Sequence, residues 1–83
     1  MIAYQVYQGS ENKHGFQDYE LQATYLSEEK ALEHAKKIVE QTPLYGDKLV
    51  DDGWYGDGKY RSWTAHGWTF VCICRIEKIE ITE

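Results

Sequence analysis

Residues 26–41 of this chain, LSEEKALEHAKKIVEQ, decide the fold class because they have the pattern of one amphipathic helix with a marked start. Ser27 can accept a hydrogen bond from a free N–H group of the first turn. The carboxylates of Glu28 and Glu29 fall where the helix dipole is positive. Apolar residues recur at three- and four-residue spacing on one face, namely Ala31, Leu32, Ala35, Ile38 and Val39. A single helix of this kind needs a sheet to cover.

Pro43 sets the end of this helix, because a proline disfavours helical geometry at the residue before it, here Thr42. We therefore expect the helix to span residues 27–41. Residues 1–25 contain two segments with the two-residue alternation of strands, joined by a polar connection, and they predict an antiparallel hairpin. In the second segment we expect one shared face made of Tyr19, Leu21, Ala23 and Tyr25.

Residues 68–82 predict a final strand that is apolar on both faces at its start. One face is expected to hold Trp68, Phe70, Cys72, Cys74 and Ile76. The other is expected to hold Val71 and Ile73. The pattern changes face near Glu77 and Lys78, as a β-bulge would allow.

Between the helix and the final strand, residues 43–67 form a region dense in glycine, aspartate and aromatic residues. A structureless connection of this length is uncommon in a compact domain, so it should hold structure of its own or carry the function. Trp54–Tyr60 indicates a tight turn between two short extended pieces. The whole pattern predicts one α+β domain over residues 1–83, a mostly antiparallel sheet of three to five strands with one helix packed on one face.

The composition excludes several classes of protein. The 83 residues carry a net charge of −5 at pH 7, which opposes direct binding to nucleic acid or to an anionic membrane. The longest apolar stretch is far shorter than the about 20 residues that cross a bilayer, and no basic segment followed by an apolar one opens the chain. Cys72 and Cys74 are expected to be reduced thiols. We therefore expect a soluble, cytoplasmic protein.

Two groups of residues could carry chemistry, and neither has the spacing that its chemistry needs. Cys72 and Cys74 could bind zinc or act as a nucleophile with His14, His34 or His66, but the thiols fall inside an apolar strand, where cysteine is usually a core residue. His34 is expected to be solvated. The aspartates of the loop region do not follow a calcium-loop pattern. We expect no metal, no cofactor and no enzymatic activity.

The remaining candidate is a binding surface in the loop region. Aromatic residues are enriched at binding hot spots, and an acidic rim would steer a basic partner. The residues expected to bind are Trp54, Tyr55, Asp57, Tyr60, Trp63, Asp51 and Asp52. The competing interpretation is that these aromatic residues complete the core of a small domain.

The run from Tyr25 to Ala31, which follows a Tyr-rich strand and leads into the helix, resembles short bacterial and phage proteins with a strand-strand-helix-strand layout. In size and acidity the chain is also similar to phage-encoded inhibitors of host defence, of the anti-CRISPR or anti-restriction type. The resemblance implies a small acidic protein that occupies a basic or nucleic-acid-binding surface of a host protein. The alternatives are a metal or thiol protein built on Cys72 and Cys74, and a structural protein that associates with copies of itself.

Overall fold

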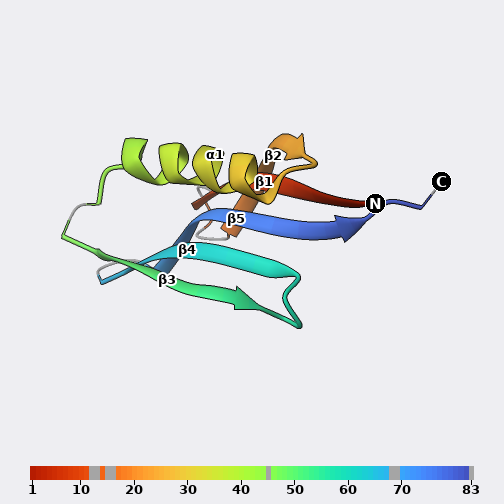
Figure 1. Cartoon of the computed structure of the whole chain (residues 1–83). Coiled ribbons are helices and arrows are strands. Elements are labelled where there is room, and N and C mark those ends of the chain that lie inside the picture. Colours follow the sequence, from red (N-terminus) through yellow and green to blue (C-terminus); the bar gives the residue numbers. More distant parts are fainter. Residues whose placement is uncertain (12–13, 15–16, 45, 68–69, 83) are drawn as a thin grey trace.

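The computed structural model of the chain describes residues 1–11, 14, 17–44, 46–67 and 70–82. Its elements are β1 (Ile2–Glu11), β2 (Gln17–Tyr25), α1 (Glu28–Gln41), β3 (Lys48–Tyr55), β4 (Tyr60–His66) and β5 (Phe70–Glu80) (Figure 1). The predicted α+β class is confirmed, with one helix and an antiparallel sheet in the described part of the chain. Within these ranges no helix is long and apolar enough to cross a membrane.

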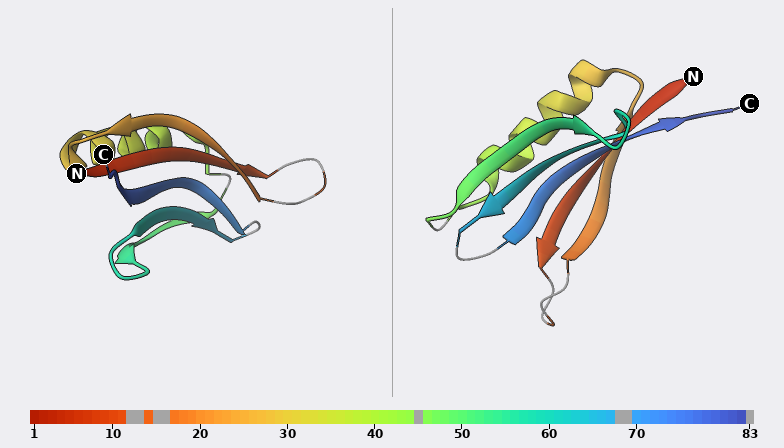
Figure 2. Two further views of the ribbon diagram at one scale, coloured as in Figure 1. Left: turned by 90° about the vertical axis from the view of Figure 1, so that its right-hand side faces the viewer. Right: turned by 90° about the horizontal axis from the view of Figure 1, so that it is seen from below.

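Over the described residues the sheet has five strands in the order β2-β1-β5-β4-β3, and every neighbouring pair is antiparallel. Figure 2 shows these strands fanned out by the twist of the sheet. β1 and β2 form the predicted hairpin. The last strand in sequence, β5, lies in the middle, where it joins the β1–β2 hairpin to the β3–β4 hairpin.

The helix ends at the predicted residue and begins at Glu28, one residue after the predicted start. Ser27 is the N-cap, and its hydroxyl oxygen accepts a hydrogen bond from the backbone N–H of Lys30 at 3.3 Å. The last helical residue is Gln41, after which Thr42 has extended geometry. α1 contacts β1, β2 and β5 and lies along β1 and β5 in Figure 1.

The core forms where α1 meets the sheet. Its buried residues are Val6, Ala31, Ala35, Ile38, Trp63, Ala65, Ile73, Cys74 and Ile76. We call the sheet face that carries these strand residues the core face and the opposite one the open face.

A bulge in β2 overturns the expected single face of that strand. Val6 pairs with Ala23 but Tyr7 pairs with Leu21, so Gln22 is an extra residue without an opposite partner. Because of this extra residue, Ala23 keeps the core face and Leu21 turns to the open face. Tyr25 lies on the same face as Ala23, and Tyr19 lies on the same face as Leu21.

A second bulge corrects the prediction for β5. Trp63 pairs with Cys74 and Thr64 pairs with Cys72, so Ile73 is the extra residue. Adjacent residues of β4 point to opposite faces, and therefore Cys72 and Cys74 do too. The face changes at Ile73 and not near Glu77 and Lys78. Trp68, expected to begin this strand, lies outside the described residues.

The region expected to be a loop is mostly a hairpin. β3 and β4 are joined by the turn at residues 56–59, which agrees with the turn predicted between Trp54 and Tyr60. Asp57 adopts a left-handed backbone there, with φ of 60°. β3 also has a bulge between Asp51 and Trp54, where Gly53 has φ of 76°. The extended pieces are longer than the sequence indicated.

The end of β1 is tied to β5 by a side chain from β2. The Gln17 side-chain amide donates to the Cys72 carbonyl at 3.2 Å, and its oxygen accepts from the Cys72 N–H at 2.8 Å. This amide takes the place of a strand beyond Gln8, where the β1–β5 pairing ends. Gly9 leaves room for it, because a Cβ at that position would overlap the Cys72 carbonyl.

Candidate binding surface

The open face carries one large ring or guanidinium from each strand. Tyr7 pairs with Arg75, and Arg75 pairs with Ser62, in positions that alternate with the core residues Val6, Ile76 and Trp63. The open face includes a set of residues at and around these positions, namely Gln5, Tyr7, Tyr19, Leu21, Tyr55, Tyr60, Ser62, Arg75 and Glu77. We call the subset Tyr7, Tyr19, Tyr55, Tyr60 and Arg75 the tyrosine cluster.

Arg75 is the centre of the tyrosine cluster. Its guanidinium carbon lies 4.3 Å from the ring centre of Tyr19, 5.5 Å from that of Tyr7 and 5.8 Å from that of Tyr60. Each cation–π contact at a partly exposed site contributes about 0.5–1 kcal/mol. The Arg75 Nε is buried and has no hydrogen-bond partner among the residues that the structure describes. The ring contacts therefore hold the guanidinium in place.

Hydrogen bonds fix two of the tyrosine rings. The Tyr55 hydroxyl lies 2.6 Å from the Ser62 hydroxyl, and its ring centre lies 5.7 Å from that of Tyr60. The Tyr7 hydroxyl donates to the Gln5 side-chain oxygen at 2.9 Å. Rings that are already held lose little conformational freedom when they bind.

Three apolar or aromatic side chains of the open face are accessible to solvent. The exposed fractions are 40% for Tyr19, 48% for Leu21 and 46% for Tyr55. Burial raises the pKa of Tyr19 above its ordinary value of 10.0, and Cys72 adds to that shift while Arg75 opposes it. Tyr19 is therefore neutral at physiological pH.

Among the open-face residues defined above, Arg75 and Glu77 alone carry charge. They lie 3.8 Å apart, measured from the Arg75 Nη2 to the Glu77 Oε2. Their opposite charges balance each other within this set of residues, although the chain as a whole carries −5.

The structure divides the seven residues expected to bind. Tyr55 and Tyr60 lie on the open face and contact each other. Trp63 is buried in the core. Asp57 lies in the β3–β4 turn. Asp52 belongs to β3, and its side chain lies outside the described part of the structure.

Trp54 and Asp51, the other two of the seven, have structural contacts on the core face. The Trp54 ring lies edge-on to Tyr4, with ring centres 6.3 Å apart, and Lys78 lies over both rings. Asp51 accepts a hydrogen bond from the Arg61 guanidinium at 2.9 Å. That hydrogen bond lowers the pKa of Asp51 below its ordinary 3.8.

Sequence reasoning missed Tyr7, Tyr19 and Arg75 as site residues. Tyr7 alternates with the apolar face of β1, which was a usable signal for the open face. The sequence predicts that Tyr19 shares a face with Ala23 and Tyr25, because nothing in the sequence marks Gln22 as an extra residue. Arg75 is the first charged residue in the apolar run of β5, and this charge is the feature of the sequence that marks it.

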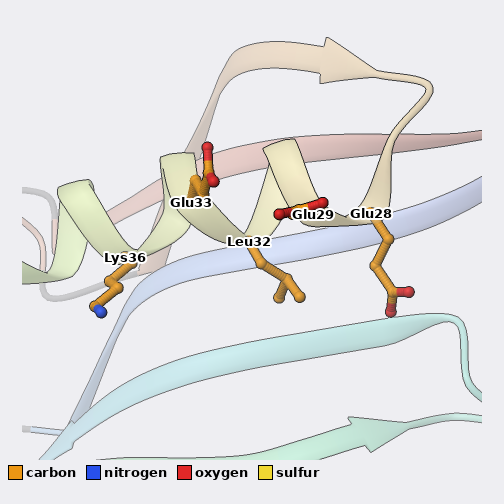
Figure 3. Close-up of a pocket in the computed structure, with 5 residues that line it drawn as sticks. All are labelled: Glu28, Glu29, Leu32, Glu33 and Lys36. Atoms are coloured by element: carbon orange, nitrogen blue, oxygen red, sulfur yellow. The ribbon is translucent and has the colours of Figure 1, made fainter.

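A groove runs between α1 and the β3–β4 hairpin on the core face, with a volume of about 400 Å³. It has apolar walls and charges of both signs at its rim, and its lining residues are Leu32, Lys36, Val39, Glu40, Leu49, Asp51, Arg61 and Trp63. Figure 3 shows the hollow next to it along α1, which shares Leu32 and Lys36. In that view Leu32 points from the helix toward the sheet, and Glu33 points away.

Cys72 and Cys74 cannot act together on one metal ion or substrate, because their side chains lie on opposite faces of the sheet. Burial raises the pKa of Cys74 to about 12, so this thiol is a poor nucleophile and metal ligand. In the described ranges no group of three or more His, Cys, Asp or Glu side chains could hold a metal ion. His34, expected to be solvated, has its Nδ1 3.0 Å from the Tyr25 hydroxyl.

Comparison of the chain with protein-family models, with curated proteins and with solved structures found no match.

Proposed function

We propose that this chain is a protein-binding domain and that the open face is its contact surface. The observation that carries the proposal is the tyrosine cluster, to which all five strands contribute. In this proposal α1 covers the core face alone, so that the open face is left for a partner. Tyrosine and arginine are the residue types most enriched at binding hot spots.

A protein partner fits this surface better than a nucleic acid. Nucleic-acid binding draws its affinity from cations that neutralise phosphates. The one cation of the tyrosine cluster, Arg75, lies beside Glu77 and is enclosed by rings. A protein patch of aromatic and apolar groups would instead bury the exposed area of Tyr19, Leu21 and Tyr55.

The charge of the molecule favours a partner with a basic surface. A net charge of −5 would steer such a partner toward the chain, and the attraction would weaken as salt screens it. Both thiols are free, as is usual in the reducing cytoplasm, which is where we place the activity. The narrower role of a phage inhibitor of a host nuclease complex is part of the proposal, supported by size and acidity.

Affinity capture with open-face variants tests the proposal. The immobilised protein is exposed to bacterial cell extract at low and at moderate salt, and retained proteins are identified by mass spectrometry. We expect a specific partner to be retained by the native chain and lost by the variant Tyr19→Ala with Tyr55→Ala, because truncating hot-spot residues costs about 2 kcal/mol or more. Recovery of a nuclease that its own DNA or RNA displaces would support the inhibitor role.

Tyr25→Ala is the control, since it removes a ring of the same kind from the core face of the sheet. It should retain the partner, provided that circular dichroism shows both variants folded. Equal capture by the native chain and the open-face variant would contradict the proposal. So would the absence of any retained protein at either salt concentration.

A further inference from the structure

The two edges of the sheet are not equivalent. Each edge strand carries one bulge, between Asp51 and Trp54 in β3 and at Gln22 in β2. Before its bulge β3 pairs regularly over residues 48–51, of which 49 and 50 are half-buried, whereas in β2 residues 17–21 pair with residues 7–11 of β1 in unbroken register, and residues 18–22 are all exposed. Exposed edge strands leave a row of backbone N–H and C=O groups free to pair with another strand, whereas a bulge disrupts such pairing. The β2 edge is therefore the better template.

The side chains of this edge alternate between two chemistries. Tyr19 and Leu21 point to the open face, and Asp18 and Glu20 point to the other face, because successive residues of a strand alternate. Within the described residues neither carboxylate has an ion-pair partner. A strand laid against this edge would meet two negative charges on one face and two apolar groups on the other.

We propose that the β2 edge, over residues 17–21, binds an extended strand of the partner protein in which basic residues alternate with apolar ones. This inference rests on the proposed function and names its mode of binding. Backbone hydrogen bonds would supply affinity, and the alternating side chains would supply specificity. The partner's basic residues would face Asp18 and Glu20, while its apolar residues would extend the open face beside Tyr19 and Leu21.

A second copy of this chain is a poorer occupant of the same edge. Antiparallel pairing of two β2 strands about Glu20 would place Glu20 opposite Glu20. Pairing about Tyr19 would place Asp18 opposite Glu20 twice. Like charges directly opposite each other destabilise a strand pair, so the acidic residues select against self-pairing and for a basic strand.

Peptides of defined pattern test the edge directly. The probe is a capped peptide in which lysine alternates with valine, and the controls are a peptide of the same composition with its lysines contiguous and one with glutamate in place of lysine. Amide hydrogen exchange followed by NMR reports the site. With saturating probe we expect exchange of the outward-facing amides within residues 17–21 to slow by at least about tenfold, as new hydrogen bonds form there.

Charge reversal supplies the second arm. Asp18→Lys with Glu20→Lys should weaken probe binding by about tenfold or more, which is about 1.4 kcal/mol. Glu29→Lys with Glu33→Lys, on the exposed side of α1, makes the same change in net charge and should weaken it much less. Equal losses in the two variants would overturn the inference, because the net charge alone would explain them. Protection along β3, or equal affinity for the contiguous-lysine control, would also overturn it.

The outcome separates this inference from the proposed function. Tyr55 and Tyr60 lie on β3 and β4, which β1 and β5 separate from β2. If the β2 charge-reversal variant captures the cellular partner as well as the native chain does, while Tyr55→Ala with Tyr60→Ala loses it, the edge inference fails and the open-face proposal stands. If the β2 charge-reversal variant loses the partner and the variant Tyr55→Ala with Tyr60→Ala retains it, the edge inference is supported and the open-face proposal is contradicted.

Discussion

At position 9 the backbone of β1 and the side chain of Gln17 share a space that only glycine leaves open. The Gln17 amide makes two hydrogen bonds to the Cys72 backbone, as a neighbouring strand would do. It also donates to the carbonyls of Ser10 and Asp18. One side chain thus ties together β1, β2 and β5 beyond the last regular pair of β1 and β5.

We expect Gly9→Ala to lower the free energy of unfolding by about 1–3 kcal/mol, because the added methyl group must displace the Cys72 carbonyl or the Gln17 amide. Chemical denaturation measures the change. Thr24→Ala, at an exposed position of β2, is the control and should cost no more than about 0.5 kcal/mol. Equal effects of the two substitutions would show that Gly9 has no special role.

At the scale of the element, two alanines decide how closely α1 approaches the sheet. Ala31 and Ala35 are one turn apart, have an exposed fraction of 0% and belong to the same buried cluster as Val6, Cys74 and Ile76. A small side chain at each position lets the helix backbone lie near the strands. The helix therefore has close backbone packing at these positions, and the largest of its buried side chains, Ile38, lies toward its end.

Ala35→Leu should destabilise the fold by about 1–3 kcal/mol, since a longer side chain would push α1 away from β1 and β5. Lys37→Leu adds a leucine to the exposed side of the same helix and should change stability by no more than about 0.5 kcal/mol. Thermal unfolding monitored by circular dichroism compares the two. A larger loss for the Lys37 variant would contradict this account of the packing.

The elements themselves were predictable because their signals are local. Ser27 and Pro43 mark the two ends of α1, and hydrophobic alternation marks the β1–β2 hairpin. The faces of β2 and β5 were not predictable, because Gln22 and Ile73 become extra residues only through the register in which β2 pairs with β1 and β5 pairs with β4. The prediction of the candidate site missed Tyr19 for this reason, since the bulge at Gln22 places Tyr19 beside Arg75.

At the scale of the whole molecule, the two faces of the sheet differ in how accessible their side chains are to solvent. Cys74 lies in the core, whereas Cys72 is half-buried on the open face near Tyr19. Two thiols of nearly adjacent sequence position thus report on different parts of the fold. One is reached from the solvent side of the sheet, and the other is reached when the core opens.

We expect iodoacetamide to alkylate Cys72 in the folded protein and to spare Cys74 until the chain unfolds globally. Burial and a pKa of about 12 leave almost no Cys74 thiolate in the folded state. Mass spectrometry of the Cys72→Ser variant isolates the Cys74 reaction in buffer and in denaturant. Similar rates in the two conditions would contradict the assignment of Cys74 to a closed core.

The central place of β5 also constrains when the chain can fold during its synthesis. β1 and β4 are hydrogen-bonded to β5 and not to each other, so the two hairpins share no strand until Phe70–Glu80 has been made. The core also remains incomplete until then, because Ile73, Cys74 and Ile76 of β5 pack in the same buried cluster as Val6, Ala31 and Trp63. A nascent chain that lacks this strand consists of separate pieces with apolar surface exposed, the condition in which chaperones and proteases act on it. Commitment to the native structure of this domain therefore requires that β5 has been synthesised.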